Sequence, residues 1–253
     1  MKHKIQREFQ EFVILLKSVP SVLLSLFILS IVLMNLLANK SIDIPLDWLA
    51  LDCGIIVSWL TFMTMDILTK HFGPKAATEI SILALLINLF VCLLLFAASV
   101  IPGNWSQSFT YAGSENAVNG ALNSTFGGAW YVVLGSSAAF AVSTVINNFL
   151  NFAIGRLFKH KPDGFIAYVC RAYVSTAIAQ FADNLIFALT VGHFFFGWTL
   201  IQCVTCAAAG MVAELLCELI FARLGYNICK KWKRTDVGAE YFRFKENKTG
   251  ENV

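Results

Sequence analysis

The sequence predicts an all-α polytopic membrane protein with six transmembrane helices and both termini in the cytoplasm. Of its 253 residues, 57% are hydrophobic and only 14% are charged, and the mean hydropathy is +0.67. A soluble domain has about 25% charged residues. Apolar stretches recur at the length of about 20 residues that a helix needs to cross the hydrocarbon core. A net charge of +3 concentrated near the chain ends also argues against a nucleic-acid-binding protein.

Six apolar stretches are long enough to span a membrane. Each is expected to be a helix, because a spanning segment must pair its own backbone polar groups, and alternating ten-residue strands typical of a barrel are absent. The six predicted spans, in chain order, are Val19–Ala38, Trp48–Thr69, Ile80–Ile101, Trp130–Leu157, Phe165–His193 and Trp198–Leu224.

The basic residues predict the orientation of the chain. All but two of the 19 Lys and Arg residues fall at the two chain ends and in the second and fourth connections, the exceptions being Lys40 and Arg171. Cytoplasmic loops carry the excess of Lys and Arg in membrane proteins. We therefore expect a cytoplasmic N-terminal segment (1–18), a six-helix transmembrane transport domain (19–228) and a basic cytoplasmic tail (229–253), in the cell inner (plasma) membrane.

Five ionisable residues fall inside the predicted spans. A charge at bilayer depth costs at least about 2.5–3.5 kcal/mol, so such residues usually face the bundle interior or a watery cavity. They are Asp66, Arg171, Asp183, Glu214 and Glu218. These positions are the first candidates for a functional site.

Asp66 lies near the end of the second span, with Trp59 seven residues earlier. Helical spacing places the aromatic ring and the carboxylate on one face. Arg171 is expected at a similar depth, so the two charges could pair across the bundle. The alternative is that Asp66 merely ends its helix at the membrane interface, close to Lys70.

The fifth span carries a polar stripe near its middle. Gln180, Asp183, Asn184 and Phe187 occur at positions i, i+3, i+4 and i+7, which is one face of a helix. Buried amides often serve only as contacts between helices, but four such residues together favour a binding site. In the fourth span, Asn148 is expected to face the same interior, either as a helix contact or as a ligand contact.

Glu214 and Glu218 form a like-charged pair one helical turn apart in the sixth span. Two carboxylates in a dry interior are not ionised together, so this pair suggests proton carriage and makes both residues candidates for energy coupling. The alternative is that Glu218 reaches the interface towards Arg223. The sequence predicts no catalytic residue, no metal site and no cofactor.

Two segments carry a resemblance to a known family. The stretch Phe62–Ala77 resembles the second-helix signature of the VUT family, the queuosine precursor transporters, and Arg171–Phe187 is similar to that family's fifth helix. With the six spans, the resemblance covers about residues 20–228. This sequence differs from the family pattern in two helices. In the fourth, Asn148 stands in place of the usual aspartate, and the last helix lacks the usual lysine. The residues that match the family are Asp66, Arg171, Ser175, Thr176, Gln180 and Asp183.

The resemblance implies a transporter, not an enzyme, that imports a 7-deazaguanine base or queuine for tRNA modification. The expected partners are this heterocyclic substrate and the lipid bilayer, without nucleic acid. A carboxylate can accept the adjacent N–H groups of a guanine-like edge, amides can pair with the carbonyl and ring nitrogens, and an aromatic ring can stack on the flat face. The expected carboxylate is that of Asp183 or Asp66. Arg171 is expected to neutralise the charge of one of these two aspartates. The expected amides are Gln180, Asn184 and Asn148, and the expected stacking ring is Trp59 or Phe187.

Three other functions are alternatives for a membrane chain of this kind. One is a substrate-binding membrane subunit of an ATPase-driven vitamin-type transporter for another small heterocycle. It would need membrane and ATPase partner subunits, because the chain has no phosphate-binding loop of its own. An intramembrane glutamate protease would need histidine ligands, and a serine protease would need a membrane histidine beside its serine. The spans supply neither, although Gly135-Ser136-Ser137 offers a serine. A purely structural membrane protein would not need Asp183 at the middle of the bilayer.

Overall fold

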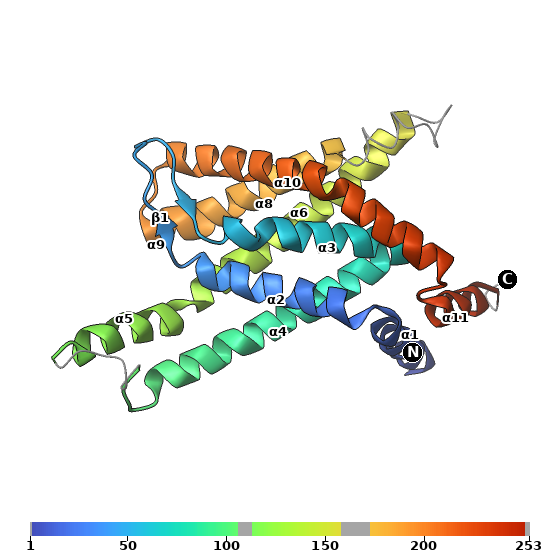
Figure 1. Cartoon of the computed structure of the whole chain (residues 1–253), viewed down its shortest axis with the longest axis horizontal. Coiled ribbons are helices and arrows are strands. Elements are labelled where there is room, and N and C mark those ends of the chain that lie inside the picture. The colour runs from blue at the N-terminus through green and yellow to red at the C-terminus, as the bar shows by residue number, and fades with distance from the viewer. Residues whose placement is uncertain (1, 106–112, 158–172, 251–253) are drawn as a thin grey trace. The chain divides into compact units, whose positions relative to one another are not determined.

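The computed structural model describes residues 2–105, 113–157 and 173–250. The elements, in chain order (Figure 1), are α1 (Lys2–Ser18), α2 (Ser21–Leu37), β1 (Ser41–Ile42), β2 (Leu51–Asp52), α3 (Ile55–Phe72), α4 (Pro74–Val100), α5 (Glu115–Gly128), α6 (Trp130–Leu157), α8 (Ser175–Phe187), the π-helix η2 (Ala188–His193), α9 (Phe194–Phe196), α10 (Leu200–Arg234) and α11 (Ala239–Gly250).

These elements confirm the predicted all-α membrane fold. Within the described ranges, four helical stretches are long and apolar enough to cross a membrane, and α1 with α2 forms a fifth candidate if the bent pair is one span. The predicted number of six spans stays a prediction. The four stretches are Pro74–Val100, Glu115–Ser143, Thr176–Phe196 and Leu200–Phe221.

The start of the predicted second span is a hairpin instead of a helix. Strands β1 and β2 pair antiparallel, with Ser41 opposite Asp52 and Ile42 opposite Leu51. The Gly54 backbone N–H donates a hydrogen bond to Asp52 Oδ1 at 2.7 Å, which is the side-chain turn that an aspartate favours over a helical backbone. Helix α3 therefore begins only at Ile55.

Two helices extend beyond the predicted spans, and one further helix lies in a predicted connection. The predicted third span begins at Pro74 as α4, and α10 continues past Leu224 to Arg234. The long predicted connection before the fourth span contains α5, which has no buried residue. Ala129, between α5 and α6, has helical backbone angles of −59° and −15°, so the helical direction continues into α6.

By their internal contacts, the residues fall into two compact units. The first unit comprises residues 1–31, 58–87 and 218–253, and the second unit comprises residues 32–57 and 88–217. Helices α2, α3, α4 and α10 contribute residues to both.

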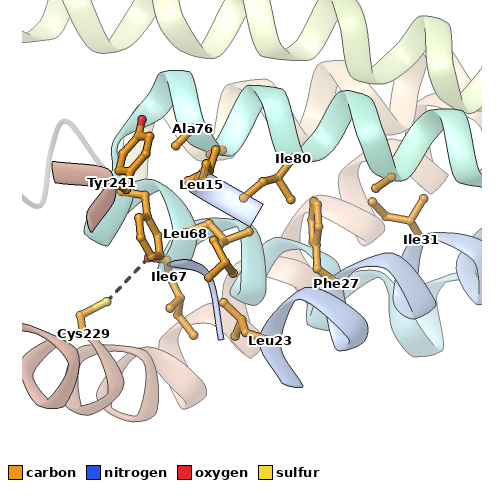
Figure 2. Packing of buried hydrophobic residues seen from close by; sticks show 14 residues of the cluster. Leu15, Leu23, Phe27, Ile31, Ile67, Leu68, Ala76, Ile80, Cys229 and Tyr241 are labelled. Carbon is orange, nitrogen blue, oxygen red and sulfur yellow. Dashed lines mark hydrogen bonds between the residues drawn. The ribbon is translucent and has the colours of Figure 1, made fainter. Parts of the chain in front are cut away.

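The first unit has one continuous apolar core (Figure 2), built on α1, α2, α3, α4, α10 and α11. Phe27 of α2 and Tyr241 of α11 are both 0% exposed in this core. The Cys229 thiol donates to the Ile67 carbonyl oxygen at 3.8 Å, and the Phe72 and Phe242 rings stack with centroids 5.9 Å apart. The basic C-terminal tail is thus packed into the core through α11.

The second unit has smaller apolar clusters between closely packed helices. One contains Ala188, Trp198, Cys203 and Cys206, and another contains Ala38, Val132 and Val191. Helices α6 and α8 run along each other. At Gly135 of α6, an added Cβ would collide with Val191 of η2, so glycine is required for the close approach of α6 and η2. Close packing of these helices brings polar groups of different helices within hydrogen-bond distance.

Candidate functional site

Helix α8 supplies the central side chains of the candidate site. Its sequence, Ser175–Phe187, contains three alanines and a single carboxylate, Asp183. Alanine favours the helix because it loses no side-chain entropy there. The helix continues directly as η2, and π-helical turns within helices are frequent at functional sites.

Asp183 faces helix α6. The Ser143 hydroxyl donates a hydrogen bond to Asp183 Oδ1 at 2.7 Å. Ser143 is 8% exposed, whereas Asp183 is only partly buried. Its carboxylate is therefore positioned by a neutral donor while part of its surface is still accessible.

Asn184, the next residue, faces helix α10 instead. Its Nδ2 donates a hydrogen bond to Glu214 Oε2 at 3.2 Å, and Glu214 is only 3% exposed. The predicted stripe on α8 is thus shared between two neighbouring helices. Helix α8 therefore contacts α6 through the Asp183 carboxylate and α10 through the Asn184 amide.

Gly210 makes the contact between Asn184 and α10 possible. It lies one helical turn before Glu214 on α10. A Cβ added there would lie 2.9 Å from Asn184 Nδ2 and 3.1 Å from Asn184 Cγ, which is closer than van der Waals contact allows. A side chain at position 210 would therefore displace the Asn184 amide.

The β1–β2 hairpin and the residues before β2 contact the first half of α10. Gln202 Nε2 donates to the Asp47 carbonyl oxygen at 3.1 Å, and Thr205 Oγ1 donates to the Trp48 carbonyl oxygen at 2.5 Å. Asp52, in β2, interacts electrostatically with Cys206 of α10. Burial raises the pKa of Asp52 to about 6, against the opposing effect of the hydrogen bond from Gly54.

Gln180 and Phe187 complete the predicted stripe. Gln180 is 1% exposed. Phe187, two turns further along, packs against the apolar cluster that contains Val132 and Val191. An aromatic ring is therefore held on the same helix as the Asp183 carboxylate and the Asn184 amide.

Trp59, the other predicted aromatic contact, belongs to the first unit. Its ring stacks on Phe221 with centroids 4.6 Å apart and planes 12° apart. Of the remaining predicted site residues, Asp66 lies on α3, Asn148 on α6 and Glu218 on α10, but their side chains lie outside the described residues. Arg171 also lies outside the described residues, so its pairing with Asp66 stays a prediction.

Two site residues were not predicted from the sequence. Ser143 lies one turn before Asn147 and two turns before Asn151, so a longer polar stripe on the fourth span would have included it. Gly210 could have been suspected because it lies one turn before the intramembrane Glu214, where a small residue lets a neighbouring helix approach.

The site's chemistry is that of recognition by hydrogen bonding. Asp183 and Glu214 each have a neutral hydrogen-bond donor, the Ser143 hydroxyl and the Asn184 amide respectively. Carboxylates, amides and an aromatic ring are suited to a flat, polar heterocycle. Among the described residues, no group of three or more His, Cys, Asp or Glu side chains could hold a metal ion.

Comparison with known proteins identifies the family. The sequence model of a family described as "Putative vitamin uptake transporter" matches residues 52–228, which is more than half of the chain and includes Asp183, Asn184 and Glu214. No curated protein and no solved structure matches the chain. The chain therefore belongs to the VUT family, the vitamin uptake transporters, and is a multi-pass membrane protein.

Proposed function

We propose that the protein imports a queuosine precursor, a 7-deazaguanine base or queuine, across the inner (plasma) membrane. Its family supports uptake of a small organic nutrient. The observation that carries the proposal is a pair of hydrogen bonds between helices. Ser143 of α6 donates to Asp183, a partly buried carboxylate on α8. Asn184 of α8 donates to Glu214, a buried carboxylate on α10.

Asp183 is the proposed recognition group for the guanine-like edge. That edge presents adjacent N–H donors, which a carboxylate can accept with both of its oxygens. The Ser143 hydroxyl orients the carboxylate through Oδ1. Asn184 and Gln180, on the same helix, are the proposed partners of the carbonyl and ring nitrogens, and Phe187 is the proposed stacking surface.

Glu214 is the proposed proton carrier. It is buried at 3% exposure and accepts a hydrogen bond from Asn184. An ionised carboxylate is expensive at bilayer depth, so proton uptake on one side and release on the other can couple to movement of the helices around a central site. A change in the protonation of Glu214 alters its hydrogen bond with Asn184, which belongs to the proposed substrate site.

The proposal is tested in a bacterial strain that cannot synthesise the precursor. The strain expresses the protein, receives the cyano, aminomethyl or free-base form, and its tRNA queuosine is measured. Asp183→Ala is expected to lower queuosine at limiting precursor by about 10–100-fold, because a hydrogen bond to a charged group contributes about 1.5–3 kcal/mol. Unchanged queuosine after Asp183→Ala, with the protein present in the membrane, would refute the proposal.

Two serines of α6 provide a matched control. Ser143→Ala removes the donor to Asp183 and is expected to weaken uptake. The Ser137 hydroxyl instead donates to the Val133 carbonyl oxygen of its own helix at 2.7 Å, so Ser137→Ala is expected to leave uptake unchanged. Equal effects of the two changes would argue against a specific role for the Asp183 contact.

Purified protein in liposomes separates proton coupling from an ATPase-driven mechanism. We expect a pH gradient alone to drive accumulation of the precursor, and Glu214→Gln to abolish that accumulation while leaving equilibrium binding in place. Uptake that required added membrane and ATPase subunits would favour the alternative mechanism.

A further inference from the structure

Helix α1 has three distinct faces. At about 100° per residue, Glu11, Leu15 and Val19 share one face, and they are 1%, 0% and 4% exposed. Ile5 and Phe9 share a second face and are 64% and 65% exposed. The first face packs on the protein, while the second presents apolar side chains outward.

The third face is polar. Gln6, Gln10 and Lys17 follow one another around α1 next to the exposed apolar face, and all three are exposed. A helix with separate apolar and polar outer faces is the type that lies in the plane of a membrane interface, with the apolar side towards the acyl chains. Burial against the protein accounts only for the first face.

The direction of α1 fits this placement. The axes of α1 and α2 differ by 102° across the break at residues 19–20. Helix α2 is predominantly apolar and has Val22 and Leu29 exposed at 71% and 53%, as expected of a helix that faces lipid. If α2 crosses the bilayer, α1 must run close to the membrane surface.

Ion pairs fix the rotation of α1 about its axis. Lys75, at the start of α4, donates to Glu8 Oε2 at 2.8 Å and to Glu11 Oε1 at 3.0 Å. These contacts hold the first face against the protein. The exposed face with Ile5 and Phe9 therefore cannot turn inward without breaking them.

Charge beside α1 is complementary to a lipid surface. Helix α11 packs on α1, and α11 and the end of α10 carry a set of exposed basic side chains. Cations near an interfacial helix attract anionic headgroups. The exposed basic residues are Lys230, Lys231, Lys233, Arg234, Arg243 and Lys245, and they outnumber the exposed acidic residues of the same segment, Asp236, Glu240 and Glu246.

We propose that α1 is an interfacial anchor that docks on the bilayer surface. Ile5 and Phe9 enter the boundary between headgroups and acyl chains, and Gln6, Gln10 and Lys17 face water. The adjoining cations of α10 and α11 contact anionic headgroups. Through Lys75, the anchor holds the start of α4 at the depth of the interface.

Tryptophan quenching by brominated lipid tests this placement. Ile5→Trp and Phe9→Trp are each compared with Gln6→Trp and Gln10→Trp in the full chain. All four positions are exposed or outward-facing, so each change leaves the packed face intact. The protein is reconstituted in vesicles of phosphatidylcholine brominated near the top of the acyl chains, with phosphatidylglycerol, and in unbrominated vesicles. The fluorescence of the six native tryptophans cancels when the parent protein is subtracted.

We expect at least twofold stronger quenching of the added tryptophan at positions 5 and 9 than at positions 6 and 10. Equal quenching at all four positions, or none at any of them, would overturn the proposal. Weak quenching at positions 5 and 9 combined with a dimer in solution would place a second copy of the chain on this face. Circular dichroism and size-exclusion elution confirm that each variant is folded.

Discussion

In the first unit, a single cluster of buried apolar side chains joins residues from both ends of the chain (Figure 2), whereas the described apolar clusters of the second unit are small. The second unit places Asp183, Asn184 and Glu214 in hydrogen bonds between helices inside candidate membrane spans, whereas the ion pairs of Lys75 in the first unit lie at the start of α4. Apolar packing stabilises a fixed arrangement, while polar groups in a membrane are expensive and usually serve function. On the proposed function, the first unit mainly supports the fold and the second unit carries recognition.

The largest expected effect on stability is that of a change in the first unit, at Tyr241. Its ring is 0% exposed and packs against the Phe72 ring at a centroid distance of 6.0 Å. Tyr241→Ala leaves a cavity, and truncation of a buried aromatic side chain costs about 3–5 kcal/mol. We expect a loss of that size in the free energy of unfolding, measured by denaturant titration in detergent micelles.

Tyr241→Phe is the matched control. Within the described part of the chain, the buried Tyr241 hydroxyl has no hydrogen-bond partner, so its removal is expected to be neutral or stabilising. Burial raises the pKa of Tyr241 to about 12 from an ordinary value of 10. The stability of the wild type should therefore fall more steeply between about pH 10 and 12 than that of Tyr241→Phe. A Tyr241→Ala variant as stable as wild type would remove the contrast between the units.

Two glycines of α10 compare the units directly. At Gly210, in the second unit, an added Cβ would lie 2.9 Å from Asn184 Nδ2, whereas at Gly225, in the first unit, it would lie 3.4 Å from Ile67 Cγ1. Gly210→Ala is expected to cost about 1–3 kcal/mol of stability by overpacking and to reduce uptake by displacing Asn184. Gly225→Ala is expected to gain about 0.5–1 kcal/mol, because alanine favours a helix interior.

The measurements are the free energy of unfolding and precursor uptake for both variants. Uptake should fall in Gly210→Ala by more than its stability loss explains, and it should be unchanged in Gly225→Ala. If both variants lost uptake equally, the polar contacts of the second unit would have no special role in transport.

Individual residues show how much the sequence alone could predict. The class of fold followed from composition and from apolar runs such as Pro74–Val100, because a membrane demands such runs whatever the tertiary structure. The stripe of α8 also followed from spacing alone. That Asp183 and Asn184 face different helices depends on tertiary packing, which no single helix encodes. The hairpin before α3 was missed because the apolar run from Trp48 continues through it, and Tyr241 because it lies in a basic, polar tail.

The smallest expected effect concerns Asp52, in the hairpin of the second unit. Burial raises its pKa from 3.8 to about 6, so the folded protein holds a proton that the unfolded chain has already lost. Stability from this group is then complete below about pH 4 and is lost as the pH rises to about 6. The contribution of Asp52 should therefore lower the thermal unfolding temperature of the wild type at pH 7 relative to pH 4.5. Asp52→Asn keeps an oxygen that can accept the Gly54 N–H but cannot ionise, so its unfolding temperature should change less over this range. An identical pH dependence in the two proteins would mean that the hairpin carboxylate is not buried in solution. The carboxylates held between elements of the second unit would then be those in the contacts of α8, Asp183 and Glu214.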